Sequence, residues 1–416
     1  MNKTINVLSK NFKKYNPSFL EDYIKIGGLE TFKACLKRDK DDIIEDIKKS
    51  GIRGRGGAAY PTGKKLEQSA EVQGDRKVII CNADEGEPGT FKDRQFLEFD
   101  PMIVIEGMMI TAYATNATEG YLYVREEYSH LHDIARDLLK QLKEAGYLGK
   151  NILGTDFSLN LSLFSGAGAY VCGEGGALIE SIEGKVGYPR SKPPYTKQCG
   201  LYQLPTLVIN VETLAAITAS LDYGIENYAK LGTKKSPGTK IISVSGKVNK
   251  PAAFEIEFGI TFNEVIDDLC GGMKDGAEPY FLQIGGASGP IIPAKYFNLA
   301  ICYDELWEYG FDVGSGAIVV VDRSTKLTEY LEAVYHFFNH ESCGKCTPCR
   351  EGNMQIAHCM SRFTANEGTL YELIQIEKYA NNMKECSFCG LGKTSPTPFL
   401  TGLKHYRTAF EEEALK

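Results

Sequence analysis

The chain has few of the features that mark a membrane protein, a nucleic-acid-binding protein or a secreted protein. Its most apolar stretch, Met102 to Ala114, is interrupted by Glu106 and is shorter than the roughly 20 residues that a bilayer-spanning helix needs. No Lys/Arg run concentrates positive charge, and the formal net charge of -7 argues against a nucleic-acid partner. Residues Met1 to Asn16 lack an apolar segment, so we expect no secretory signal and a cytoplasmic protein.

The features that are present indicate a globular protein with more than one core. A chain of 416 residues with 43% hydrophobic content is long enough for several domains of the usual size. It contains 12 cysteines, and several of them are clustered at the spacings found in metal sites. This usage fits a reducing compartment better than a disulfide scaffold.

The most informative of these features is a group of cysteines near the C-terminus. Cys343, Cys346 and Cys349 follow the spacing C-x-x-C-x-x-C, and Cys386 and Cys389 lie further along the chain. Three such thiolates can bind three corners of a [4Fe-4S] cluster, and a remote fourth thiolate can complete the site, which favours electron transfer as the function. Zinc and plain buried thiols are the alternatives, although an overlapping third cysteine disfavours zinc. Spacing alone does not distinguish Cys386 from Cys389 as the fourth ligand.

Two glycine-rich segments predict an anion-binding site. The segment 51–65 contains five glycines, two arginines and two lysines. Glycines let backbone N–H groups approach a phosphate closely, and the basic side chains supply the opposite charge. A flexible loop is the alternative, and the segment is not the G-x-G-x-x-G of a Rossmann turn. The second segment, 165–178, follows a predicted strand at 158–164 and opens a helix, so both segments can contact one ligand.

Polar side chains follow two further predicted strands, at 77–81 and 206–209. Ligands of open α/β sheets bind at the carboxyl ends of the strands, so these side chains are candidates for hydrogen bonds to a polar ring or a ribityl chain. A solvated turn after the first strand is the alternative. The residues concerned are Asn82, Asp84, Glu85 and Glu87 after the first strand and Asn210, in a helix-capping position, after the second.

The second half of the chain changes character twice. Predicted strands at 240–248, 254–258 and 317–321, with a helix at 260–270, indicate a small α+β domain. From Leu327 onward the pattern is helical apart from the cysteine loops. The apolar faces predicted there comprise Tyr330, Val334 and Phe337 on one helix and Leu370, Leu373, Ile374 and Tyr379 on another.

Together these motifs resemble those of a known family. They are the segments 54–65, 82–87, 166–178, 192–195, 210–213 and 341–352. Over nearly its whole length the chain is similar to the FMN-binding, NADH-oxidising flavoprotein subunit of respiratory complex I. It is equally similar to the diaphorase subunits of soluble NAD(P)-linked hydrogenases, formate dehydrogenases and electron-bifurcating complexes.

The resemblance implies a fold of several domains. An α/β, Rossmann-like FMN domain is followed by a small α+β, ubiquitin-like β-grasp domain and a C-terminal helical bundle that carries a [4Fe-4S] cluster. The implied ranges are 1–50 for N-terminal helices that pack on the flavin domain, 51–238 for the FMN- and NAD(P)-binding domain, 239–324 for the β-grasp domain and 325–416 for the cluster domain.

The resemblance also implies roles for individual residues. Those expected near the FMN phosphate are Gly54, Arg55, Gly56, Gly57 and Lys65. Those expected around the flavin are Asn82, Asp84, Glu85, Tyr170, Gly173, Glu174, Asn210 and Thr213. Those expected to bind the dinucleotide are Tyr60 and Tyr195 at its adenine, with Glu87, Gly175 and Lys192 nearby. The implied cluster ligands are Cys343, Cys346, Cys349 and Cys389.

The implied activity is hydride exchange between NAD(P)(H) and FMN, followed by transfer of single electrons through the cluster. No acid–base residue is strictly required, although Glu87 is expected near the nicotinamide. Relatives carry Gly-Glu-Glu-Thr where this chain has Gly-Glu-Gly-Gly at 173–176, so one carboxylate is missing and we predict weaker exclusion of the NADP 2'-phosphate. Ile209, Leu66 and Gln68 also depart from the family pattern. A relay or scaffold subunit without dinucleotide turnover is therefore the alternative function.

The expected partners are other protein subunits. The chain shows no appended ferredoxin-like or thioredoxin-like cysteine segment, so electrons are expected to leave through another subunit. The resemblance implies a thioredoxin-like [2Fe-2S] subunit and a larger iron-sulfur catalytic subunit, with no nucleic acid and no direct membrane insertion. Hydrogen, formate, ferredoxin, quinone and a second nicotinamide pool are all compatible as the final redox partner.

Overall fold

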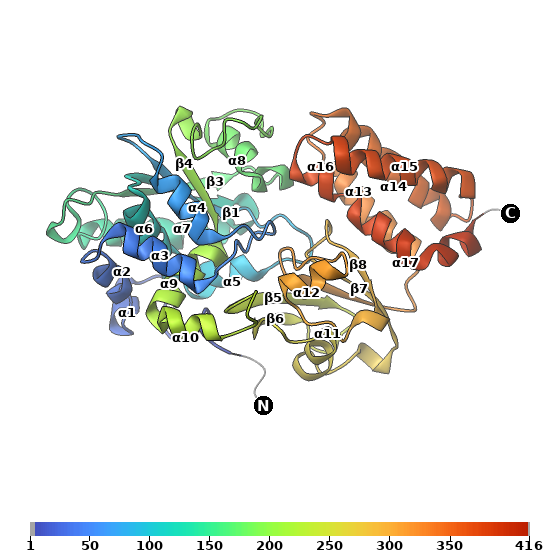
Figure 1. Cartoon of the computed structure of the whole chain (residues 1–416), viewed down its shortest axis with the longest axis horizontal. Helices are drawn as coiled ribbons and strands as arrows, with labels where there is room; N and C mark the ends of the chain where they lie inside the picture. The colour runs from blue at the N-terminus through green and yellow to red at the C-terminus, as the bar shows by residue number, and fades with distance from the viewer. Residues whose placement is uncertain (1–4, 415–416) are drawn as a thin grey trace. The chain divides into compact units, whose positions relative to one another are not determined.

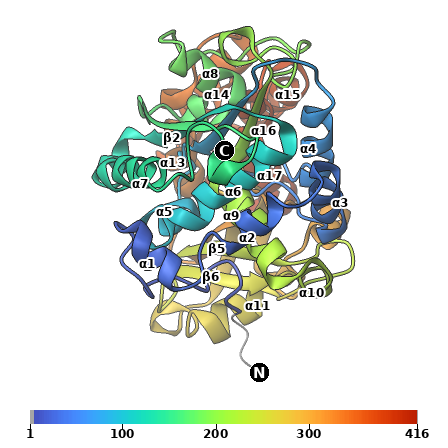
Figure 2. The same cartoon turned by 90° about the vertical axis from the view of Figure 1, so that its left-hand side faces the viewer.

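The computed structural model describes residues 5–414, which divide into two compact units (Figures 1 and 2). Within the described residues, the first unit comprises 5–86, 91–242 and 253–259, and the second comprises 87–90, 243–252 and 260–414. The predicted ranges 1–50 and 325–416 include residues 1–4 and 415–416, which lie outside the described residues.

A four-stranded parallel sheet runs through the first unit in the order β3-β2-β1-β4. Its strands are β1 (Val78–Ala83), β2 (Glu119–Arg125), β3 (Asn160–Gly166) and β4 (Thr206–Asn210). The central strand β1 is almost continuously apolar and buried, as expected for a parallel strand that is covered on both faces. The strand order reverses between β1 and β4, where Asn82 is in register with Asn210. Such a reversal is the usual ligand-binding point of an open α/β sheet.

The helices of the first unit surround this sheet. They are α1 (Leu20–Lys25), α2 (Glu30–Cys35), α3 (Lys40–Ser50), α4 (Thr62–Ala70), α5 (Lys92–Phe99), α6 (Pro101–Thr115), α7 (His132–Glu144), α8 (Gly175–Ile182), α9 (Val211–Tyr223) and α10 (Ile225–Lys230). The apolar stretch seen in the sequence forms α6, which is almost entirely buried. It lies against α9 so closely that a Cβ on Gly107 would be 2.3 Å from the carbonyl oxygen of Leu214. In the part of the chain that the structure describes, no helix has the length and hydropathy of a membrane span.

A buried carboxylate on α6 ties the N-terminal helices to the rest of the first unit. Glu106 accepts hydrogen bonds from the Tyr23 hydroxyl at 2.7 Å and from the backbone N–H of Phe32 at 2.9 Å and Leu29 at 3.1 Å. Burial raises the pKa of Glu106, and these three donors oppose that rise. An acidic residue inside an apolar helix is therefore compatible with the core because its oxygens are satisfied.

A mixed, five-stranded sheet has the order β6-β5-β9-β7-β8. Its strands are β5 (Thr239–Gly246), β6 (Ala252–Glu257), β7 (Pro279–Ile284), β8 (Ile291–Pro293) and β9 (Ala317–Asp322). β9 pairs in parallel with β5 and antiparallel with β7. The helix predicted at 260–270 is observed as the short α11 (Phe262–Glu264) followed by a π-helical turn at 265–269, and α12 (Tyr303–Glu308) precedes β9.

The rest of the second unit is helical, as the sequence predicts. Its helices are α13 (Leu327–Glu341), α14 (Thr347–Thr364), α15 (Leu370–Cys386), α16 (Gly390–Thr394) and α17 (Thr397–Glu413). The buried face of α13 comprises Leu327, Thr328, Leu331, Val334, Tyr335 and Phe338, and that of α15 comprises Leu373, Ile376, Ala380 and Met383. Of the predicted faces, Val334 and Leu373 are buried, whereas Leu370, Ile374 and Tyr379 are exposed.

Candidate functional site

Several residues predicted to surround a flavin lie at the carboxyl ends of β1 and β4. The side-chain amide of Asn82 donates to the carbonyl of Gly173 at 2.8 Å, and its oxygen accepts from the N–H of Asp84 at 3.1 Å. The side-chain amide of Asn210 donates to Asp93 at 2.7 Å. Both asparagines are therefore held in place by the chain itself, at the point where the strand order reverses.

The first glycine segment lies beside Asn210. A Cβ on Gly56 would be 3.2 Å from Cβ of Asn210, and the N–H of Arg55 donates to Thr213 Oγ1 at 2.9 Å. Gly57 has φ +119° and nothing within 4 Å of an added Cβ, so its backbone borders open space. The predicted Gly54 belongs to the same loop, and its N–H donates to the carbonyl of Tyr60 at 2.8 Å. The backbone of this segment can therefore approach a ligand.

The Arg55 side chain, by contrast, is directed into the protein. It is 1% exposed, its guanidinium donates to the carbonyl of Thr239 at 2.9 Å, and it lies 4.7 Å from the ring centre of Phe258. These contacts anchor the glycine segment to the start of β5. Lys65 is consequently the better source of positive charge toward an anion.

Lys65 extends from α4 to the end of β4, where its ammonium donates to the carbonyl of Val208. Burial, together with repulsion from Lys192, lowers the pKa of Lys65 to about 8. Within residues 5–414 no carboxylate forms an ion pair with it. A desolvated cation of this kind, next to a glycine segment that borders open space, fits the phosphate of FMN.

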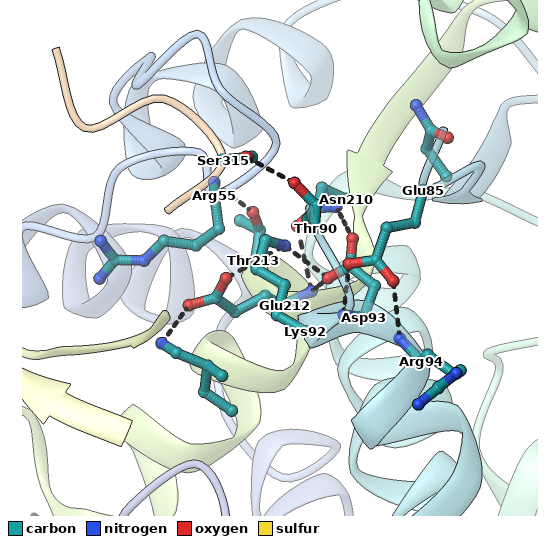
Figure 3. A network of polar contacts seen from close by, with 12 residues as sticks. Arg55, Glu85, Thr90, Lys92, Asp93, Arg94, Asn210, Glu212, Thr213 and Ser315 are labelled. Carbon is teal, nitrogen blue, oxygen red and sulfur yellow. Dashed lines mark hydrogen bonds and ion pairs between the residues drawn. The ribbon is translucent and has the colours of Figure 1, made fainter. Parts of the chain in front are cut away.

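A buried network of charges lies directly behind Asn210 (Figure 3). The Lys92 ammonium lies 2.6 Å from Asp93 and 3.1 Å from Glu212, and Lys240 lies 2.8 Å from Glu212. Although burial disfavours its charge, the ammonium groups of Lys240 and Lys92 lower the pKa of Glu212 to about 2. The network is fully charged at neutral pH and fixes Asn210 through Asp93. Of its members, only Asn210 was predicted as a site residue.

Glu85, a predicted flavin residue, is bound by the chain on several sides. Its oxygens accept from the N–H groups of Asp93 at 2.7 Å and Arg94 at 3.0 Å, and from the hydroxyl of Tyr128 at 3.0 Å. Burial and the nearby charge of Asp93 raise the pKa of Glu85 to about 7. Its carboxylate therefore holds the first turn of α5 in place.

The residues predicted to bind a dinucleotide form a second group in the first unit. Lys192 pairs with Glu174 at 2.6 Å, and Glu174 also caps α8 by accepting from the N–H of Gly176 at 2.7 Å. Gly175 is the first residue of α8, and the nearest atom to an added Cβ is 3.8 Å away, so a side chain has room there. The two predicted aromatic residues are surface-exposed, Tyr60 by 42% and Tyr195 by 52%.

Two more predicted residues flank the turn after β1. Tyr170 packs on that turn: a Cβ on Gly86 would be 3.1 Å from its ring. Glu87 belongs to the second unit, where its carboxylate accepts from the N–H of Ser288 at 2.8 Å and from its hydroxyl at 3.0 Å. Glu87 is thus grouped with the loop after β7, and the other predicted flavin and dinucleotide residues belong to the first unit.

The four predicted cluster ligands all belong to the second unit. Cys346 is the N-cap of α14, Cys349 lies in its first turn, and Cys389 is the N-cap of α16. Burial raises the pKa of Cys349 to about 11, and the neighbouring thiols of Cys346, Cys389 and Cys343 raise it further. Cys386 is exposed and does not contribute to this shift. The interactions thus group Cys389 with the three motif cysteines.

Close packing joins the two cysteine segments. A Cβ on Gly392 would be 2.9 Å from Cβ of Cys349 and 2.7 Å from Cβ of Ser387. The Lys345 ammonium lies 4.3 Å from the ring centre of Phe388, which precedes Cys389. Across residues 5–414 no three His, Cys, Asp or Glu side chains converge on the position of one metal ion. A [4Fe-4S] cube takes each thiolate at a different iron, so four thiols that surround a space fit its geometry.

These two sites define a class of protein in which one chain combines a flavin region with an iron-sulfur region. Residues 47–219 match the family model described as the Nuo51 FMN-binding domain, and residues 329–413 match the NADH-ubiquinone oxidoreductase-F iron-sulfur binding region. The chain belongs to the NADH-quinone oxidoreductase family defined by these two regions, which confirms the predicted resemblance and its FMN and [4Fe-4S] cofactors.

Individual relatives support this assignment. The chain is 39% identical to an NADH-quinone oxidoreductase flavoprotein of this family from Rhizobium meliloti, covering 97% of this chain and 96% of that protein. It is 38% identical to the NADP-reducing hydrogenase protein HndC of Solidesulfovibrio fructosivorans, covering 98% and 83%. A solved NAD+-reducing [NiFe]-hydrogenase in the H2-reduced state superposes with a TM-score of 0.85 at 33% identity, covering 95% of this chain. The chain spans 66% of the length of that hydrogenase chain.

Proposed function

We propose that this chain is the NAD(P)H-oxidising flavoprotein subunit of a larger redox complex. It exchanges hydride between a nicotinamide dinucleotide and FMN and passes single electrons through a [4Fe-4S] cluster to partner subunits. The observation that carries the proposal is that one chain contains both the FMN-binding domain and the iron-sulfur binding region. When bound, FMN converts a two-electron hydride into single electrons, which a cluster accepts one at a time.

The residues of the first unit bind and orient the flavin in this proposal. Lys65 neutralises the phosphate, and the N–H groups of the glycine segment around Gly57 donate to it. Asn82 and Asn210 form the polar edge of the flavin pocket, and their own hydrogen bonds keep them from reorienting. Arg55 acts indirectly by anchoring the glycine segment.

The dinucleotide is proposed to bind at the second group of residues. Tyr60 and Tyr195 offer exposed aromatic faces for the adenine, and Lys192 offers a cation near a polyphosphate. The absence of a side chain at Gly175 leaves one fewer carboxylate near the ribose, which supports use of NADP(H) as well as NAD(H). Glu87 is proposed near the nicotinamide.

In the second unit, the proposed cluster ligands are Cys343, Cys346, Cys349 and Cys389. We further propose that residues 239–324 form a β-grasp domain, because their sheet is mixed and contains the parallel pair β5 and β9. The predicted domain ranges remain proposals in the same sense. The proposed partners are a thioredoxin-like [2Fe-2S] subunit and a larger iron-sulfur catalytic subunit, in the cytoplasm.

Anaerobic mixing of the purified holoprotein with NADH or NADPH tests the function. We expect the flavin absorbance to bleach on mixing, with the cluster reduced afterwards. If flavin and cluster are both present and neither dinucleotide bleaches the flavin, the chain is instead a relay or scaffold subunit. Faster turnover with NADPH than with NADH supports NADP(H) use, whereas equal or faster turnover with NADH counts against it.

A further inference from the structure

A buried amide lies one helical turn beyond the most buried of the four cluster thiols. Asn353 is four residues after Cys349 on α14, and its side-chain Nδ2 lies 3.3 Å from the Cys349 Sγ. We propose that Asn353 sets the reduction potential of the cluster by donating a hydrogen bond to this sulfur. The inference rests on the [4Fe-4S] cluster of the proposed function.

The surroundings of Asn353 leave the thiol as the partner of its amide. The residue is 0% exposed, and its Oδ1 has no hydrogen-bond partner within residues 5–414. An iron-bound thiolate can only accept hydrogen bonds, so of the two ends of the amide only the Nδ2 end can favourably face it. Removing an amide from water is costly unless it makes a compensating bond, and the Sγ provides one.

A structural role alone does not explain an asparagine at this position. Asparagine is a poor helix former, and an apolar residue of similar size would suit a fully buried position in α14 at least as well. The same sulfur lies 3.4 Å from the hydroxyl of Ser342, so it has two potential donors once it is a thiolate. The amide is the one that is fully removed from solvent.

The expected effect on the potential follows from charge. Reduction adds one electron and no proton to the cluster, and the negative charge on its thiolate sulfurs increases. A hydrogen bond to a thiolate therefore strengthens on reduction and raises the potential, which is one of the recognised ways in which proteins tune iron-sulfur clusters.

The test is a redox titration of the holoprotein, followed by the electron paramagnetic resonance signal of the reduced cluster. Asn353→Leu removes the donor at similar volume, and Asn353→Asp keeps the shape but replaces the donor with an acceptor. We expect both variants to titrate at a lower potential. A tenfold change in the reduced-to-oxidised ratio at a fixed ambient potential corresponds to about 59 mV for one electron.

Asn381→Leu is the matched control. The Asn381 amide also donates to a group one turn earlier, the carbonyl of Glu377 at 2.8 Å, but it is exposed on α15. We expect the potential of this variant to equal that of the wild type.

Two outcomes overturn the inference. One is an unchanged potential in both Asn353 variants at full iron and sulfide content. The other is loss of the cluster in both, which would make the amide necessary for assembly instead of for tuning. Iron and sulfide analysis of the wild type comes first, because a wild type without a cluster refutes the proposed function itself.

Discussion

The flavin region and the cluster region differ in how far their polar groups are already satisfied by the chain. In the flavin region, Glu212 is paired with Lys240 and Lys92, and Asn210 is fixed by Asp93. In the cluster region, the pKa of Cys349 is raised to about 11, so the thiol is protonated at neutral pH until iron displaces its proton. The first region is therefore expected to keep its shape without its cofactor, whereas the second depends on its cofactor.

Removal of a cluster ligand tests this dependence and has the largest expected effect. We expect Cys389→Ala to lose most of its iron and sulfide, because its thiol is grouped with the three motif cysteines. Helices α14 and α16 should then become more accessible to protease. The matched variant Cys386→Ala removes an exposed thiol from the same segment and should keep the cluster. The opposite result, measured as iron and sulfide per chain, would make Cys386 the fourth ligand.

Breaking the charge network tests the other side of the comparison. Glu212→Gln removes the shared partner of two buried ammonium groups, and breaking a buried ion pair in this way typically costs about 3–5 kcal/mol. Glu144→Gln breaks an exposed helical pair with Lys140 and should cost less than about 1 kcal/mol. Denaturant unfolding followed by circular dichroism measures both. Equal costs would show that the network does not stabilise the flavin region.

The pH dependence of FMN binding sharpens the comparison within the first unit. The pKa of Lys65 is lowered to about 8 in the unliganded chain, and a bound phosphate would raise it again. The free chain loses this charge as pH rises through 8, so the FMN dissociation constant should increase about tenfold between roughly pH 7 and 9.

Flavin fluorescence quenching with the unliganded chain measures this change. Lys65→Met should bind FMN more weakly and with a much flatter pH profile. If the variant retains the tenfold change, the titrating group is not Lys65.

The sequence predicted those parts of the molecule that depend on local pattern. Strands β1, β3 and β4 appear as apolar runs or alternation, and the polar residues that follow them mark the carboxyl ends of the sheet. The structure adds that Asn82 and Asn210 are neighbours in register. Strand β2 was not predicted, and neither was the reversal of strand order that gives these residues their position.

The charge network could not be predicted because its contacts join distant segments. Glu212 and Lys240 belong to different predicted elements, and no spacing rule connects them. A lysine at the start of a predicted buried strand was the one available signal, since a buried cation needs an acidic partner. The Arg55 side chain shows the converse limit: its loop was identified, but whether an arginine faces a ligand or the core depends on tertiary contacts.

The smallest expected effect concerns the specificity of the dinucleotide site. Gly175→Glu introduces a carboxylate at the first position of α8, where the structure has room for a side chain and where a helix N-terminus favours negative charge. Repulsion of about 1 kcal/mol toward a 2'-phosphate would lower the NADPH-to-NADH ratio of kcat/KM about fivefold. Asn227→Asp adds the same charge on the exposed side of α10 and should leave the ratio unchanged. An unchanged ratio in Gly175→Glu would mean that this position does not face the adenosine ribose, and the case for NADP(H) use would lose its structural support.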